Sequence, residues 1–226
     1  MDFHQRQTIA GQAIYTKLVL SLYDFIVLTV SNRWIWKCPT PIILTHYNRH
    51  MSDNHLDVGV GTGYYLDRGK YPSANPRIVL FDLNSNALEH TMNRIARFAP
   101  ESHQVDVLKP ISLNGLAKFD SVGINYLLHC LPGVGISDKS CIFDHLREMM
   151  DDNAVLFGAT ILGREVPRSW VAEKLMIFYN GKGIFSNRDD GLVDLKGELE
   201  KRFRDVEIQV FGCVAVFSAR GLLSNS

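Results

Sequence analysis

Residues 55–63 read His55-Leu56-Asp57-Val58-Gly59-Val60-Gly61-Thr62-Gly63, and this stretch decides the fold. A short β-type run enters a loop with glycine at every second position, and a helical stretch follows at 64–69. Glycine allows positive φ and a close approach of the backbone to a ligand, and a helix N-terminus adds partial positive charge. The spacing is G-x-G-x-G and not the G-x-G-x-x-G that holds a pyrophosphate. The stretch predicts a ligand-binding strand–loop–helix unit, with a tight turn that binds no ligand as the alternative.

Outward from this loop, β-type runs alternate with helical stretches, which is typical of a parallel α/β sheet. The β-type runs lie at 55–60, 77–82, 104–108, 119–126, 154–162, 205–211 and 214–219, and the clearest helical stretches at 85–98, 138–150 and 171–178. Only Gly212 and Cys213 separate the last two runs, so these two strands should be antiparallel neighbours. We therefore expect an α/β three-layer sandwich with a seven-stranded, mostly parallel sheet and an antiparallel last strand. Residues 1–54, broken by Pro39 and Pro41, should form an N-terminal helical cap or lid on a domain at 55–226.

The composition limits the partners and the compartment. Lys+Arg and Asp+Glu number 24 each, so the formal net charge is zero and a nucleic-acid partner is disfavoured. The four cysteines have no metal-ligand spacing, which predicts free thiols in a cytoplasmic protein and no metal site: Cys38, Cys130, Cys141 and Cys213. The apolar stretch 13–30 contains Lys17 and Asp24, so we expect a helix against the core and no membrane span.

Two acids follow the glycine loop at the ends of predicted strands. Asp82 ends the second strand, where a carboxylate can accept hydrogen bonds from both hydroxyls of a ribose. Its alternative role, as N-cap of the next helix, could be filled by Asn84 or Ser85 instead. Asp106 follows the third strand, where an adenine amino group would lie, or else it is an ordinary turn residue.

With these residues in view, the chain resembles the class I S-adenosylmethionine-dependent methyltransferases over about residues 55–220. The resemblance implies the sheet order 3-2-1-4-5-7-6, with S-adenosylmethionine across the C-terminal strand tips and S-adenosylhomocysteine as product. It assigns the methionine end of the cofactor to the first motif and the ribose to the acid that ends the second strand. It assigns the adenine to the residue after that acid and to a pair of residues after the third strand. A further residue ends the fourth strand beside the transferable methyl. In the same order, these positions are Asp57, Gly59, Gly61 and Gly63 for the methionine end, Asp82 for the ribose, Leu83, Asp106 and Val107 for the adenine, and Asn125 beside the methyl.

The run Leu127-Leu128-His129-Cys130-Leu131-Pro132-Gly133 resembles a group of small-molecule methyltransferases from microbial secondary metabolism. The motif Asn/Asp-Pro-Pro-aromatic, typical of protein and nucleic-acid methyltransferases, is absent from the fourth strand of this sequence. Methyl transfer is an in-line displacement that mainly needs alignment, and a base helps when the acceptor is a hydroxyl. His129 is the candidate base, beside Cys130 as an acceptor contact; the alternative is a structural histidine bonded to the strand-end backbone.

Aromatic residues gather in the predicted cap. Trp36 and Tyr47 are candidate walls of an apolar acceptor site, with ordinary packing as the alternative. Tyr15 and Tyr23 are candidate cofactor contacts, because related small methyltransferases often use an N-terminal tyrosine. The apolar N-terminal helix could also pair with a second copy in a homodimer.

The sequence thus predicts a methyltransferase that acts on a small, apolar, natural-product-like acceptor, with O-methylation favoured. Two alternatives stay open: a protein of this fold that binds the cofactor but catalyses another reaction such as a cyclisation, and a non-catalytic binding protein.

Overall fold

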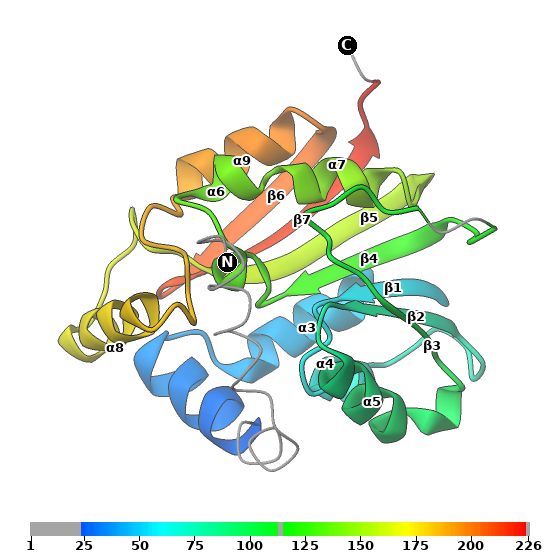
Figure 1. Ribbon diagram of the computed structural model, residues 1–226, viewed down its shortest axis with the longest axis horizontal. Coiled ribbons are helices and arrows are strands. Elements are labelled where there is room, and N and C mark those ends of the chain that lie inside the picture. Colours follow the sequence, from blue (N-terminus) through cyan, green and yellow to red (C-terminus); the bar gives the residue numbers. More distant parts are fainter. Residues whose placement is uncertain (1–23, 113–114, 225–226) are drawn as a thin grey trace, which may run out of the picture.

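The computed structural model describes residues 24–112 and 115–224, with side chains from residue 30 onward (Figure 1). Its centre is one seven-stranded sheet in the order β3-β2-β1-β4-β5-β7-β6. The strands are β1 (Asn54–Val58), β2 (Arg77–Asp82), β3 (Glu101–Gln104), β4 (Phe119–Asn125), β5 (Met150–Ile161), β6 (Phe203–Phe211) and β7 (Val214–Leu222). The first five are parallel, whereas β7 runs antiparallel to both β5 and β6. The expected topology, including the terminal hairpin, is confirmed.

Helices cover both faces of the sheet (Figure 1). They are η1 (Asp24–Ile35), α3 (Thr40–His50), α4 (Tyr64–Arg68), α5 (Ser85–Arg94), η2 (Ala96–Phe98), η3 (Leu128–Cys130), α6 (Ile136–Lys139), α7 (Cys141–Arg147), α8 (Trp170–Gly181) and α9 (Leu192–Glu200). Strand residues alternate between the two faces: Val79 and Phe81 of β2 pack in the core under α6, α7 and α9. Ile78 and Leu80 pack in the core under α3, α4 and α5.

The third strand differs from its expected position. It spans Glu101–Gln104, and the predicted run 104–108 is mostly a turn that follows it. The strand is short, polar and at the sheet edge, so its sequence lacks an apolar run. Val105 and Val107 drew the prediction because they are apolar, yet they pack against the core from the loop.

The described part of the N-terminal region is tied to the sheet. Ile43 and Tyr47 of α3 are fully buried, and α3 packs against β5 and β7. Pro41 lies in the first turn of α3, where a proline costs no helical hydrogen bond. Helix α3 is therefore part of the helical layer on one face of the sheet, and it brings Tyr47 beneath the glycine loop.

Two further sequence expectations concern the surface and the thiols. No helix in the described ranges is long and apolar enough to cross a bilayer. All four cysteines are free thiols.

Candidate cofactor site

The three glycines that follow β1 all have positive φ, and two different constraints account for them. Gly59, Gly61 and Gly63 have φ of 73°, 54° and 70°. A Cβ on Gly59 would lie 2.8 Å from the Leu127 side chain, and a Cβ on Gly63 would lie 2.7 Å from Thr91. A Cβ on Gly61 would meet no atom within 4 Å. The outer two glycines are thus required by packing, whereas Gly61 faces open space, where a ligand can approach the backbone.

Asp82 stands at the tip of β2, next to this loop. Its Oδ1 accepts a hydrogen bond from the Asn84 backbone N–H at 2.8 Å. Burial raises the pKa of Asp82 to about 6, although hydrogen bonds from the backbone N–H groups of Asn84, Gly61 and Val60 lower it. Asn84, and not Asp82, caps α5, because its side chain accepts from the Asn86 N–H. The carboxyl group is therefore held against the glycine loop without being needed as a helix cap.

Asp57 is buried beneath the loop and bonds to the N-terminal helix. Its Oδ2 accepts a hydrogen bond from the Tyr47 hydroxyl at 2.7 Å and lies 3.5 Å from His55 Nε2. Asp57 is 7% exposed and Tyr47 is fully buried. Burial and the neighbouring Asp57 raise the pKa of Tyr47 well above its usual value, so its hydroxyl stays protonated and is the donor. At least one oxygen of Asp57 therefore supports the loop from below.

The same network continues across the sheet. His55 Nε2 lies 2.9 Å from the Tyr47 hydroxyl oxygen, and His55 Nδ1 lies 2.9 Å from Ser121 Oγ on β4. Because the Tyr47 proton goes to Asp57, Nε2 must be the donor in a neutral His55, and Nδ1 then accepts from Ser121. Ser121 Oγ in turn accepts from the Ser52 backbone N–H at 2.9 Å. Four segments of the chain thus meet in one buried hydrogen-bonded chain under the glycine loop.

The predicted adenine contacts lie on the loop after β3. Asp106 Oδ1 accepts from the Leu108 N–H at 3.2 Å, and its Oδ2 lies 3.1 Å from Lys109 Nζ. Val107 is buried, and Leu83 is half-buried with its carbonyl bonded to the Gln104 side chain. The three predicted residues follow neighbouring strand ends, as an adenine site requires, but Asp106 also has the turn geometry of its alternative role. The adenine contacts of these residues stay predictions.

Strand β4 ends in two residues that are unusual for different reasons. Both polar side-chain atoms of Asn125 are buried and lack a hydrogen-bond partner within the described residues. An unmade buried hydrogen bond costs about 1–3 kcal/mol, so this amide is suited to a bound polar group. Tyr126 has φ of 57°, a strained value for a residue with a Cβ. An open glycine, an acid and an unsatisfied amide at neighbouring strand tips together fit the predicted cofactor.

The predicted catalytic role of His129 is not supported by its surroundings. The ring is 3% exposed and packs edge-on against Phe185 at 4.5 Å between centroids. Its Nδ1 lies 3.4 Å from both the Ile161 N–H and the Thr160 hydroxyl. Burial, and then the positive charge of Lys139, lower the pKa of His129 to about 3. A group that protonates so reluctantly is a poor general base near neutral pH, and the geometry corresponds to the structural alternative.

Cys130 lies half-buried next to His129. Burial raises the pKa of the Cys130 thiol to about 12, so the thiol stays neutral. Its Sγ is 3.9 Å from the Tyr126 carbonyl oxygen, and its side chain packs against an apolar cluster that includes Phe185. Cys130 can therefore supply an apolar contact but no nucleophile.

A buried ion pair that no motif in the sequence indicates fixes this strand-tip segment. Lys139 Nζ lies 2.8 Å from Asp190 Oδ2 and also donates to the carbonyl oxygens of Leu128 and Ser186 at 3.1 and 2.6 Å. The two charged side chains are 1% and 0% exposed. Burial raises the pKa of Asp190 to about 6, although Lys139 lowers it. A lone lysine and a distant aspartate gave no signal in the sequence, because only the fold brings them together.

Two residues predicted as acceptor walls are buried, and their contact with an acceptor stays a prediction. Trp36 is 2% exposed and packs against Phe185, with 6.0 Å between ring centroids. Tyr47 is fully buried and its hydroxyl is bonded to Asp57. Both belong to the core, so neither lines an open cavity. Tyr15 and Tyr23 lie outside the described residues.

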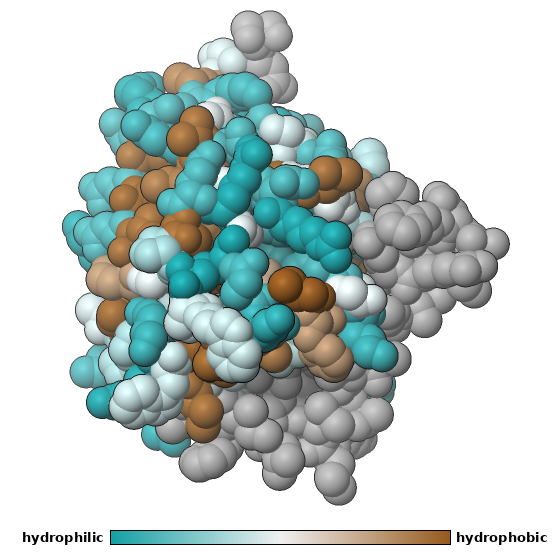
Figure 2. Space-filling model, turned by 90° about the vertical axis from the view of Figure 1, so that its left-hand side faces the viewer, coloured by the Kyte–Doolittle hydropathy of each residue, from teal (hydrophilic) through white to brown (hydrophobic). Residues whose placement is uncertain are grey.

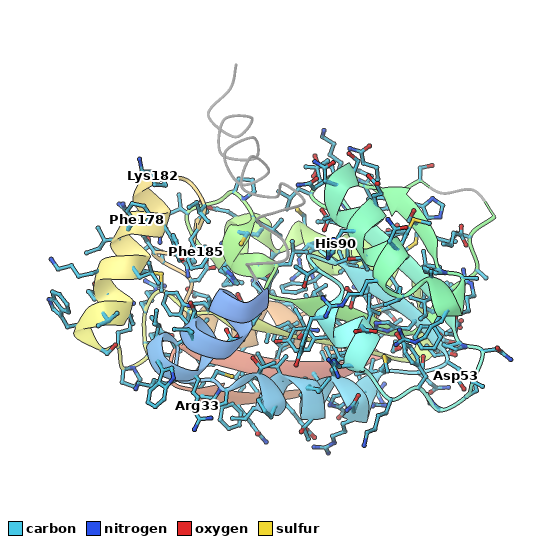
Figure 3. All side chains as sticks on the ribbon, turned by 90° about the horizontal axis from the view of Figure 1, so that it is seen from below. Arg33, Asp53, His90, Phe178, Lys182 and Phe185 are labelled. Carbon is cyan, nitrogen blue, oxygen red and sulfur yellow. The ribbon has the colours of Figure 1, made fainter. Side chains whose placement is uncertain are left out.

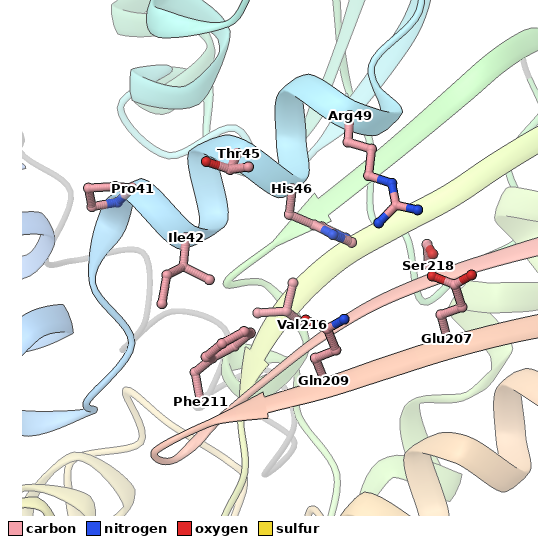
Figure 4. Close-up of a pocket in the computed structure, with 10 residues that line it drawn as sticks. All are labelled: Pro41, Ile42, Thr45, His46, Arg49, Glu207, Gln209, Phe211, Val216 and Ser218. Carbon is pink, nitrogen blue, oxygen red and sulfur yellow. The ribbon is translucent and has the colours of Figure 1, made fainter.

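A separate groove of about 380 Å³ lies between α3 and the β6–β7 hairpin (Figure 4). The residues that line it include the apolar Ile42, Phe211 and Val216 at one end and the charged Arg49 and Glu207 at the other. No glycine-loop residue lines this groove. In the described ranges, no group of His, Cys, Asp or Glu is arranged to hold a metal ion.

We expect Gly61→Ala to abolish tight binding of S-adenosylhomocysteine without unfolding the protein. Its Cβ would meet no protein atom but would occupy the open side of the loop, so affinity should fall at least about tenfold. Gly115→Ala is the matched control, because Gly115 also has positive φ and an open Cβ position. Both variants should lose ~1 kcal/mol of stability through backbone strain. Isothermal titration and urea unfolding measure the two effects, and equal affinity of both variants would contradict a ligand at Gly61.

The pKa of Asp82 predicts a pH dependence for the same ligand. Ribose hydroxyls donate to the carboxylate form, so affinity should fall as the pH drops below about 6 and Asp82 becomes protonated. The slope should approach tenfold per pH unit if only the ionised form binds. Asp82→Asn should bind weakly with no such slope. A wild-type affinity that stays constant between neutral and acidic pH would refute the ribose role.

Comparison with known proteins identifies the family of the chain. A family model described as a methyltransferase domain matches residues 56–156. The chain is 40% identical to a physcion biosynthesis cluster O-methyltransferase of Aspergillus chevalieri, over 92% of this chain and 94% of the relative. It is 38% identical to a demethylluteothin O-methyltransferase of Streptomyces thioluteus, over 95% and 92%. The solved DhpI–SAH complex has the same fold, with a TM-score of 0.69 at 13% identity over 97% of this chain and 99% of that one.

The sheet order, the glycine loop with its strand-tip acid, and these full-length relatives lead to one conclusion. The chain belongs to the class I S-adenosylmethionine-dependent methyltransferases, in the group that modifies small molecules of secondary metabolism.

Proposed function

We propose that the enzyme methylates a hydroxyl oxygen of a small, largely apolar acceptor that lies beside the tip of β4. The observation that carries this proposal is the composition of that tip: the unsatisfied Asn125 amide adjoins the cluster that contains Tyr126, Cys130, Tyr179 and Phe185. A few polar groups within an apolar and aromatic wall are typical of sites for apolar small molecules. Two relatives named as O-methyltransferases support oxygen as the acceptor atom.

The residues of this chain would act mainly by alignment. When bound, S-adenosylmethionine supplies an activated methyl group on a sulfonium sulfur. Asp82 would orient the ribose, Gly61 would let the cofactor lie against the backbone, and the apolar wall would exclude water. The site would hold the acceptor oxygen in line with the methyl carbon, so that the new carbon–oxygen bond would form as the carbon–sulfur bond broke, and the hydroxyl proton would pass to solvent. His129 keeps the segment after β4 in place through its backbone carbonyl, which accepts from the Ser186 N–H at 2.8 Å.

We also propose that the protein is cytoplasmic and that its partner is a small molecule rather than a nucleic acid. The four free thiols support a reducing compartment, and the balanced charge supports the absence of a polyanionic partner. The proposed homodimer would use the apolar N-terminal stretch, most of which lies outside the described residues.

The function is tested with methyl-labelled S-adenosylmethionine and a panel of phenolic aromatic acceptors. The proposal expects labelled product and S-adenosylhomocysteine in equal amounts with at least one acceptor that carries a free hydroxyl. Acceptors whose hydroxyl is already methylated are the control and should give neither product. Conversion of an acceptor without S-adenosylhomocysteine would favour the cyclisation alternative, and no conversion of any acceptor would favour a binding protein.

His129→Asn separates the structural role of His129 from a catalytic one. The asparagine Oδ1 can take the place of Nδ1 as acceptor for the Ile161 N–H but cannot serve as a base near neutral pH. We expect turnover within about fivefold of wild type, because a general base typically contributes about a hundredfold or more. A hundredfold loss of turnover with unchanged thermal stability and cofactor affinity would restore His129 as the base.

A further inference from the structure

Exposed apolar side chains gather on one side of the molecule. Nine large apolar side chains are exposed among the described residues, and six of them lie on η1 and α8: Val30, Trp34, Trp170, Val171, Ile177 and Phe178. Helix α8 projects at the lower left in Figure 1, and Figure 2 faces this side, where apolar side chains stand among hydrophilic ones. Single exposed apolar residues are ordinary, but a cluster of this size marks an interaction surface.

Helix α8 is apolar on two opposite faces. Ala172 and Met176 are buried in the cluster that contains Trp36. The outer face carries Trp170 and Val171, and two turns later Ile177 and Phe178, with exposed fractions between 50% and 74%. The face of a surface helix that points to solvent normally carries charged and polar side chains. The outer face of α8 therefore lacks a covering layer in the described part of the chain.

Basic side chains surround this surface without carboxylate partners. Lys174 shares the outer face of α8 by helical spacing, and Lys182 Nζ lies 6.0 Å from the Phe178 ring. Arg33 and Lys37 lie 5.4 and 6.0 Å from the Trp34 ring. None of these four cations forms an ion pair within the described ranges, whereas Glu173 of α8 is bonded to Arg168 at 2.7 Å. The whole chain has no net charge, and these four cations add positive charge around the exposed apolar side chains.

We infer that the outer face of α8, together with Trp34, docks on an anionic lipid surface. Exposed aromatic and aliphatic side chains interspersed with lysines are the side chains with which a surface helix contacts a membrane interface. A second copy of the chain would bring like charges together across a two-fold axis. Residues 1–23 contain Arg6 and Lys17 against Asp2 alone, so they would not neutralise the four cations. A projecting helix also needs no complementary groove in a fluid bilayer.

The docking surface is linked to the proposed acceptor site, and this step alone rests on the proposed function. From α8, Tyr179 packs on Phe185 at 4.8 Å, and Phe185 packs on His129 at 4.5 Å. In Figure 3, Phe178 and Lys182 lie on the outer side of α8, whereas Phe185 lies toward the sheet. The helix that would contact lipid therefore leads directly to the apolar wall beside β4. An apolar acceptor dissolved in a membrane would meet the enzyme at this side.

The test is co-sedimentation of the full chain with phosphatidylcholine vesicles that contain or lack phosphatidylglycerol. We expect binding to the anionic vesicles that weakens in high salt and without phosphatidylglycerol. Lys174→Glu with Lys182→Glu should weaken binding at least about thirtyfold, since each lysine near an anionic surface contributes ~1 kcal/mol. Lys70→Glu with Lys118→Glu is the matched control, because both lysines are exposed, lie elsewhere and change the net charge equally.

The apolar contribution has its own pair of variants. Ile177→Ser with Phe178→Ser should lose vesicle binding, while Val134→Ser with Val193→Ser, both 70% exposed outside this surface, should retain it. Unchanged S-adenosylhomocysteine affinity shows that each variant is folded. Wild type that stays in the supernatant, or equal binding by the lysine pair and its control, would overturn the inference. So would a dimer in light scattering that Ile177→Ser with Phe178→Ser converts to a monomer, since the surface would then join two copies. None of these results depends on the methyl acceptor.

Discussion

A single buried hydrogen bond, from the Tyr47 hydroxyl to Asp57 Oδ2, joins the N-terminal helix α3 to the strand that carries the glycine loop. A carboxyl group without a partner is costly to bury, and Asp57 lies almost wholly out of contact with solvent. The tyrosine supplies the required donor, and His55 and Ser121 extend the network to β4. Because Gly59 follows Asp57 by two residues, this network determines where the glycine loop begins.

The cofactor site depends on that fixed starting point. Gly61 presents open backbone, Asp82 bonds to the loop from β2, and Asn125 offers an unsatisfied amide from β4. These groups come from neighbouring parallel strands, whose carboxyl ends necessarily meet at one edge of the sheet. The segment after β4 is held by a second buried network, in which Lys139 and Asp190 bond to each other and to the backbone. Alignment of the cofactor and the acceptor thus rests on two polar networks within an apolar core.

Local sequence signals predicted the fold well, because the features that decide it are short-range. The glycine loop at 59–63 and the two-residue gap at Gly212 and Cys213 each depend on neighbours in the chain. The third strand was misplaced because its four residues are polar and take their conformation from pairing with β2. The same reason explains the site: Gly61 and Asp82 follow from motifs, whereas the burial of His129, Trp36 and Tyr47 and the Lys139–Asp190 pair arise only from long-range packing. The sequence alone does not distinguish an aromatic residue that lines a cavity from one that supports a loop.

The most direct test of this account is titration of the wild type and Tyr47→Phe with S-adenosylhomocysteine. Tyr47 is fully buried beneath the loop, so removal of its hydroxyl can alter affinity only through its partners Asp57 and His55 and the position of the loop. We expect at least about tenfold weaker binding, since a hydrogen bond to a charged group contributes ~1.5 kcal/mol or more. Tyr71→Phe is the comparison variant, because the Tyr71 hydroxyl donates to the Leu66 carbonyl oxygen at 3.2 Å and not to Asp57, so its affinity should change less than that of Tyr47→Phe. Equal affinities for wild type and a folded Tyr47→Phe would show that the loop does not depend on this hydrogen bond and would contradict the account.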